Sequence, residues 1–200
     1  MTDLLQALRS ATRPLHDELD GAAASRKIGE GTLTADDYRR LIAWQYRAHA
    51  VAEGGLEDFS WPGPYRYRRR GPALLAEARA LGLPLPLVRA LQPPQTLARA
   101  TGRAYVLEGS SLGGNKILGH LRRNARLAGL SDFDFYAFQR DEGLGQWRGF
   151  TAFAKTRDWT PEEVGEAQVE AVRVFGVFGD GGTMDRSSRD GGTMDDGPLR

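Results

Sequence analysis

Apolar residues recur at the three- and four-residue spacing of an α-helix along most of the chain, and no segment alternates apolar and polar residues as a half-buried strand does. Helix start signals fit this pattern: Thr2 or Asp3, then Thr34 with Asp37, then Thr160 before Pro161. The 200 residues are enough to bury one sizeable core. We therefore expect an all-α protein with a single globular domain.

Glycine and proline mark where the predicted helices stop. Pro14 interrupts the first helix, which either kinks there or restarts with Thr12 as a cap. Further helices are predicted from Thr34 to about Phe59, over 73–81 up to Gly82, through most of 95–128, over about 143–155, and after Thr160. The proline-rich stretch 60–72 is predicted to be a loop.

The composition changes at Asp180. The sequence DGGTMD occurs at 180–185 and again at 190–195, and no apolar periodicity accompanies it. Such a segment cannot bury enough apolar surface to fold by itself. We expect a helical domain over 1–179 and a disordered tail over 180–200 that the chemistry does not need.

Charge and cysteine content exclude several classes of protein. The formal net charge is only +1, whereas a general nucleic-acid binder carries a basic excess. The chain has no cysteine, which rules out disulfide frameworks, iron–sulfur clusters and cysteine nucleophiles. No apolar run approaches a membrane span, and no secretory signal is evident. These features fit a cytoplasmic protein that binds neither nucleic acid nor membrane.

The segment YVLEGSSLGGNKILGH at 105–120 places glycines in the middle of a predicted helix. Each glycine costs about 1 kcal/mol relative to alanine there. Gly109 and Gly113 are four residues apart and share a face without side chains, with Ser110 beside it. Such a face permits close approach of another helix or of a flat ligand, and spacing alone favours helix packing.

Only three histidines are present, so any histidine chemistry has few candidates. His16 borders the apolar stripe of the first helix; such a residue is usually a hydrogen-bonded core histidine, but neutral imidazole is also a good iron ligand in a haem pocket. His49 and His120 are expected to be structural or exposed.

Three segments taken together resemble the haem oxygenase family. Residues 8–20 (LRSATRPLHDELD) look like its proximal helix, 33–53 like its second conserved helix, and 105–117 like its glycine-rich distal helix. WRGF at 147–150 and the final helix also lie where the family has them. The likeness implies a single-domain helical bundle with haem between a proximal and a kinked distal helix. It is closest to bacterial members, including those paired with bacteriophytochromes.

The resemblance also implies roles for individual residues. His16 would be the axial iron ligand, and Arg9 would meet a haem propionate. Gly109, Gly113 and Gly114 would let the distal backbone lie close to the haem. Ser110 stands where mammalian-type members carry an aspartate that organises proton delivery, so it would be the distal polar group.

The implied reaction opens haem to biliverdin, carbon monoxide and ferrous iron. It uses molecular oxygen and an external electron donor such as reduced ferredoxin, and a bacteriophytochrome is a candidate recipient of the biliverdin. The arginines in RYRRR (66–70) are either a solvated segment, which is the commoner case, or a docking patch for an acidic donor. The missing aspartate keeps a haem carrier without turnover as the alternative. A non-haem di-iron site is less favoured, because the chain lacks Glu-x-x-His.

Overall fold

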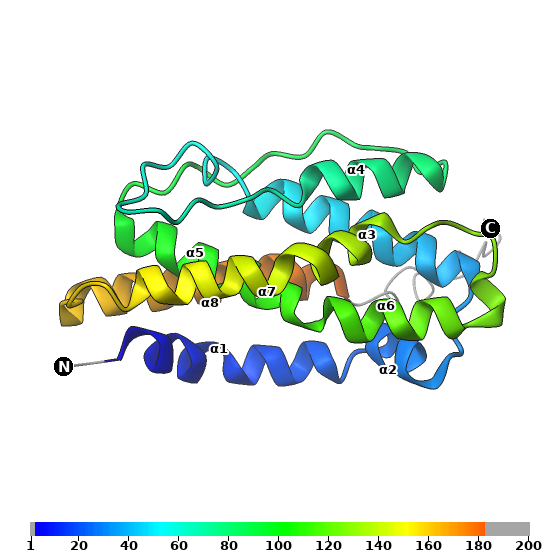
Figure 1. Cartoon of the computed structure of the whole chain (residues 1–200), viewed down its shortest axis with the longest axis horizontal. Helices are drawn as coiled ribbons and strands as arrows, with labels where there is room; N and C mark the ends of the chain where they lie inside the picture. Colours follow the sequence, from blue (N-terminus) through cyan, green and yellow to red (C-terminus); the bar gives the residue numbers. More distant parts are fainter. Residues whose placement is uncertain (1–2, 183–200) are drawn as a thin grey trace, which may run out of the picture.

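The structure is a computed structural model that describes residues 3–182 (Figure 1). Its α-helices are α1 (Leu4–Asp20), α2 (Ala23–Glu30), α3 (Ala35–Ala52), α4 (Gly71–Ala80), α5 (Leu97–Ser110), α6 (Gly114–Arg123), α7 (Asp134–Ala154) and α8 (Pro161–Gly182). Two short 3-10 turns are η1 (Ser111–Gly113) and η2 (Ala125–Leu127). The described residues contain no strand, and the predicted all-α fold is confirmed.

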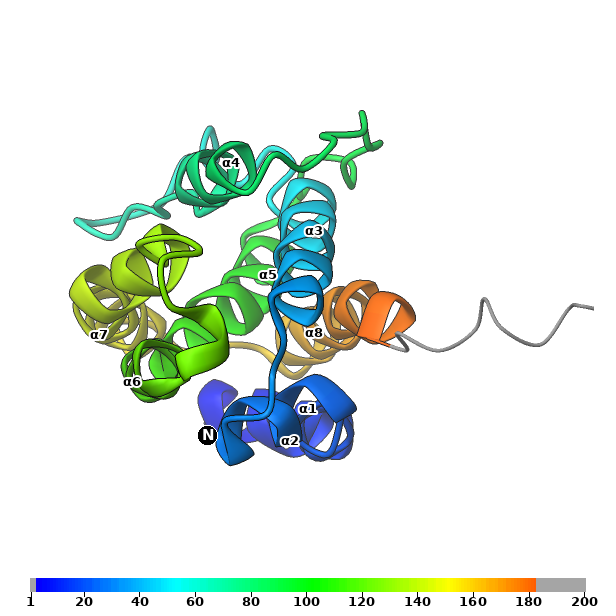
Figure 2. The same cartoon turned by 90° about the vertical axis from the view of Figure 1, so that its right-hand side faces the viewer.

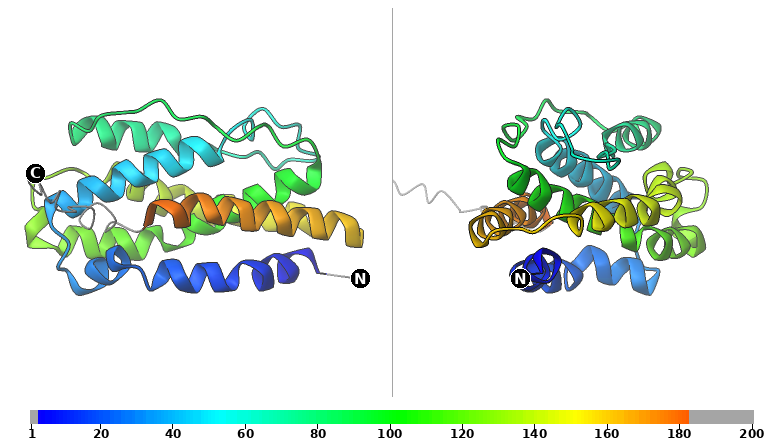
Figure 3. Two further views of the ribbon diagram at one scale, coloured as in Figure 1. Left: turned by 180° about the vertical axis from the view of Figure 1, so that it is seen from behind. Right: turned by 60° about the vertical axis from the view of Figure 1, so that its left-hand side comes forward.

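α5 lies at the centre of the bundle, seen end-on in Figure 2. Nine of its 14 residues are buried, including the charged side chains of Arg103 and Glu108. α8 packs against both α5 and α1, and α1 runs beside α8 along the outer face of the bundle (Figure 3). α3 and α4 cover the opposite side. α5 is therefore surrounded by helices on most sides, and its C-terminal end turns toward α6 and α7.

Three predicted start signals are present as hydrogen bonds. Asp3 Oδ1 accepts from the Leu5 amide at 3.0 Å at the start of α1. Thr34 and Asp37 form a reciprocal capping box at α3, and Thr160 and Glu163 do the same at α8. Each side chain satisfies backbone donors that have no partner inside the helix.

Pro14 does not divide the first helix. α1 is continuous from Leu4 to Asp20 with Pro14 inside it. The Thr12 hydroxyl donates to the Leu8 carbonyl at 2.9 Å, so Thr12 is part of the helix and not the cap of a second one. Arg9 and His16 consequently lie on one helix, about two turns apart.

The predicted end of the helix that starts after Thr34 is wrong, as is the predicted start of α7. The helix predicted to reach Phe59 ends at Ala52, because Gly55 adopts a positive φ of 66°. Gly54 is also so close to the 83–96 segment that a Cβ there would lie 2.3 Å from the Leu91 carbonyl oxygen.

α7 begins at Asp134, nine residues before the predicted start, and no local cap marks this point. Glu77 of α4 supplies an acceptor instead, since its Oε2 receives the Phe135 amide at 3.4 Å. α2 was not predicted, and its N-cap makes no side-chain hydrogen bond.

α8 extends to Gly182, three residues past the predicted domain boundary at 179. The tail that we predict beyond this point, with most of its DGGTMD repeat, lies outside the described residues. As to membranes, none of the helices in the described range has the length and apolar character that a crossing needs.

Gly102 should be essential to the contact between α5 and α8. A Cβ at this position would lie 2.1 Å from the Ala167 carbonyl oxygen, a backbone atom that cannot move without shifting α8. We expect Gly102→Ala to lower the free energy of unfolding by about 1–3 kcal/mol in urea denaturation. Gly165→Ala on α8 is the control: a Cβ there meets nothing within 4 Å, so this variant should gain about 0.5–1 kcal/mol. Equal changes in the free energy of unfolding for the two variants would contradict a close contact between α5 and α8 at Gly102.

Candidate functional site

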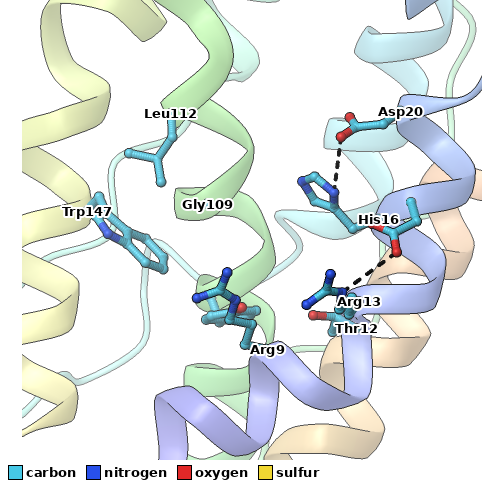
Figure 4. A pocket seen from close by; sticks show the side chains of 10 residues that line it. Arg9, Thr12, Arg13, His16, Asp20, Gly109, Leu112 and Trp147 are labelled. Atoms are coloured by element: carbon cyan, nitrogen blue, oxygen red, sulfur yellow. Dashed lines mark ion pairs between the residues drawn. The ribbon is translucent and has the colours of Figure 1, made fainter.

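A cavity of about 480 Å³ opens between α1, α5 and α7 (Figure 4). This volume lies in the range of about 300–1,000 Å³ that is usual for small-molecule sites. Ten residues line it: Arg9, Thr12, Arg13, His16, Asp17, Asp20, Tyr105, Gly109, Leu112 and Trp147. The predicted residues Arg9, His16 and Gly109 thus meet at one cavity, although more than 90 positions separate the first two from the third.

His16 projects from α1 toward the cavity, and its side chain is 60% exposed. Its Nδ1 lies 3.3 Å from Asp20 Oδ2, one helical turn further on. Nε2 has no hydrogen-bond or ion-pair partner among the described residues. A carboxylate on one ring nitrogen fixes the orientation of an imidazole and leaves the other nitrogen to bind a metal.

Gly109 forms the opposite wall of the cavity (Figure 4). A Cβ at Gly109 would meet only Cζ3 of Trp147, at an ordinary contact distance of 3.6 Å. Helix packing therefore does not require glycine here. The bare backbone instead leaves room inside the cavity, which favours the ligand interpretation over the packing one at this position.

The remaining lining gives the cavity an amphipathic character. Tyr105, Leu112 and Trp147 provide aromatic and apolar surface, and Leu112 is 47% exposed. Arg9 and Arg13 of α1 provide positive charge, and Arg13 also lies 3.8 Å from Asp17. A flat apolar ligand that carries carboxylates and a metal in its plane would match these groups.

The other predicted site residues do not line this cavity. Ser110 points its hydroxyl back to the Leu107 carbonyl at 2.8 Å. Gly113 is exposed, and a Cβ there would contact only Ile117 at 3.6 Å. Gly114 has a packing role, since a Cβ would come within 2.4 Å of Gln139 Cβ on α7.

Several cavity residues were not predicted. Asp20 could have been found, because its position four residues after His16 places it on the same helix face. Arg13 has the same relation to Arg9. Trp147 had no local signal as a wall residue; only the packing of α7 beside α5 brings it to the cavity.

The other two histidines lie elsewhere. His49 is buried between the rings of Phe135 and Phe178. His120 lines a separate polar cavity near Gly29–Gly31 and Asn124–Arg126. Within the described part of the chain, no three histidine, aspartate or glutamate side chains come together as a metal site, which is what a di-iron centre requires.

Glu53 should make stability depend on acid pH. It is buried, and burial by itself raises the pKa of a carboxyl group. Contacts from His49, the Arg70 amide and the Tyr67 hydroxyl outweigh burial and lower the pKa of Glu53 from 4.5 to about 2. A depressed folded-state pKa contributes stability above pH 4.5 that is lost as the pH falls toward 2, here about 3 kcal/mol.

Denaturation of the native protein and Glu53→Gln at pH 6 and pH 3 checks this prediction. The glutamine variant lacks the titrating group, so the stability difference between the two proteins should shrink at the lower pH. A difference that stays constant would contradict the role of Glu53.

Comparison with known proteins gives one relative in sequence and one similar solved structure. The chain is 34% identical over 156 residues to a heme oxygenase of Xanthomonas campestris pv. campestris (strain 8004). The aligned region covers 76% of this chain and 92% of the relative. Its fold is similar to the crystal structure of the NO- and CO-bound heme oxygenase from Neisseria meningitidis, with a TM-score of 0.66 and 18% identity. That match covers 97% of this chain and 100% of the other. No protein-family model matches the chain.

Proposed function

Because the chain belongs to the haem oxygenase family, we propose that the cavity between α1 and α5 binds haem with His16 as its axial ligand. The observation that carries this proposal is that His16 and the bare backbone at Gly109 face one another across a single cavity. The reaction is the opening of haem to biliverdin, carbon monoxide and ferrous iron, and the family assignment favours this turnover over a haem carrier.

His16 and Asp20 support the proximal half of the site. Asp20 Oδ2 lies 3.3 Å from Nδ1 of His16, where it can accept from that nitrogen and leave Nε2 for the iron. Haem supplies the iron and the macrocycle that react with molecular oxygen. The protein orients that macrocycle, and the glycine wall at Gly109 allows the distal backbone to lie against it.

Arg9 and Arg13 support one orientation of the haem in its plane. Both guanidinium groups line the cavity on α1, whereas Asp17 and Asp20 lie at later positions on the same helix. Carboxylates are attracted to the arginines and repelled by the acidic pair. Arg13 already pairs with Asp17, whereas Arg9 has no acidic partner among the described residues, so we infer that the propionates lie toward Arg9.

The partners follow from the reaction. Turnover needs molecular oxygen and an external electron donor, for which reduced ferredoxin is the candidate, and a bacteriophytochrome is a candidate recipient of biliverdin in the cytoplasm. A donor-docking patch at 66–70 cannot include Arg70, which is buried against Glu108. Arg68 and Arg69 remain partly exposed, although they pair with Glu142 and Glu57.

One visible spectrum followed in time tests the function. Purified protein receives one equivalent of haemin and then reductant under air. We expect a Soret band on binding, followed by its loss and the growth of a broad red band from the opened ring. A Soret band that persists under reductant and air would contradict turnover, and no spectral shift with haemin would contradict haem binding.

A further inference from the structure

We propose that Arg70 is a positioning residue that fixes the break between α5 and α6 above the haem cavity, acting through Glu108 and Ser111. The proposal rests on the proposed function only for the identity of the ligand below the break. The contacts that hold the break belong to the protein alone and lie outside the cavity lining.

The break itself has little intrinsic rigidity. α5 ends at Ser110, η1 spans Ser111–Gly113, and α6 starts at Gly114. Three glycines within six residues favour many backbone conformations over a helix. Because Gly109 lies at the cavity wall one turn before α6, any change at the break would move that wall.

α7 restrains one side of the break. A Cβ on Gly143 would lie 2.8 Å from Ser111 Cβ, and one on Gly114 would lie 2.4 Å from Gln139 Cβ. These close approaches hold the break against α7. They are packing contacts and not directional hydrogen bonds, so they do not by themselves fix the rotation of α5 about its axis.

Arg70 restrains the other side with directional contacts. Its Nη2 forms an ion pair with Glu108 Oε2 and also donates to Ser111 Oγ at 3.1 Å. Glu108 and Ser111 bracket Gly109 in the sequence, and Tyr65 adds a hydrogen bond to Glu108 Oε1 at 2.7 Å. Arg70, Glu108 and Ser111 are all buried, where such bonds are shielded from water.

Arg70 is in turn anchored by its own surroundings. Its backbone amide donates to Glu53 Oε1 at 2.6 Å, and its Nη1 donates to the Arg68 carbonyl at 2.9 Å. The guanidinium lies 4.9 Å from the centre of the Tyr67 ring. A fork of donors held in this way can fix two residues of the distal helix at once, which a single point charge cannot do.

Ser111→Ala and Arg70→Lys test the inference, alone and combined. In the haem-free protein, each single variant should speed amide hydrogen exchange at 108–114 by about tenfold, the change expected when one hydrogen bond to a charged group is lost. In the ferrous carbon monoxide complex, each should shift or broaden the C–O stretching band. The double variant should match Arg70→Lys alone, because Arg70→Lys already removes the hydrogen bond that Ser111→Ala removes.

Thr101→Ala is the matched control. Thr101 is also a buried hydroxyl of α5, but it donates only to the Leu97 carbonyl. This variant should keep native exchange at 108–114 and the native C–O band. Native exchange in both test variants, or C–O shifts that simply add in the double variant, would overturn the inference. Failure of the native protein to bind haem would instead refute the proposed function, and the exchange measurement would still decide the role of Arg70.

Discussion

The His16→Ala variant is expected to lose the six-coordinate ferric haem spectrum and all turnover. Among the described residues that line the cavity between α1 and α5, His16 is the only histidine, and its Nε2 has no protein partner there. An alanine removes the proposed iron ligand and leaves the rest of the cavity in place. Titration with haemin, followed by absorption spectra and single-turnover assays, measures both losses.

Added imidazole should restore the spectrum of His16→Ala, because the substitution leaves space where the ring was and imidazole supplies the same nitrogen. His120→Ala is the matched control, since His120 lines a different cavity and should leave the haem spectrum native. A native spectrum in His16→Ala would show that another group ligates the iron. The same measurement on Asp20→Asn would report how far the carboxylate orients the ring.

Local sequence signals predicted the elements that begin with their own caps. α1, α3 and α8 start at Asp3, Thr34 and Thr160, where a side chain accepts from the helix's own backbone. α7 has no such signal because its acceptor, Glu77, comes from α4, more than 50 positions earlier. Boundaries set by tertiary contacts of this kind cannot be read from neighbouring residues.

The residues of the functional site, too, could be predicted from the sequence only in part. His16 and Gly109 stand out individually, one as a rare residue type and the other as a costly one inside a helix. Their spacing could not decide whether the glycines make room for a ligand or for a neighbouring helix. In the structure the two positions differ, with open space at Gly109 and a tight contact at Gly114. The buried ion pair between Arg70 and Glu108 was not predicted, because an arginine in a predicted loop is ordinarily exposed.

Gly109→Leu is expected to weaken haem binding while leaving the haem-free protein folded. The Cβ meets only Trp147 at 3.6 Å, and the rest of the side chain would occupy the cavity space in which we propose that haem binds. Overpacking of this kind costs about 1–3 kcal/mol, which corresponds to about 5- to 150-fold weaker binding. Haemin titration and urea denaturation of the haem-free protein measure the two effects separately.

The stabilities of two alanine variants decide whether position 109 needs glycine to leave room for a ligand or to let helices pack closely. Gly109→Ala should raise the unfolding free energy of the haem-free protein by about 0.5–1 kcal/mol, because alanine favours the helix and no neighbour is displaced. Gly114→Ala should lower it by about 1–3 kcal/mol, because its Cβ would overlap Gln139. A gain in unfolding free energy at Gly109 and a loss at Gly114 would mean that glycine at position 109 costs the protein stability and serves the ligand that we propose in the cavity. Destabilisation by both would mean that the whole break is shaped by helix packing.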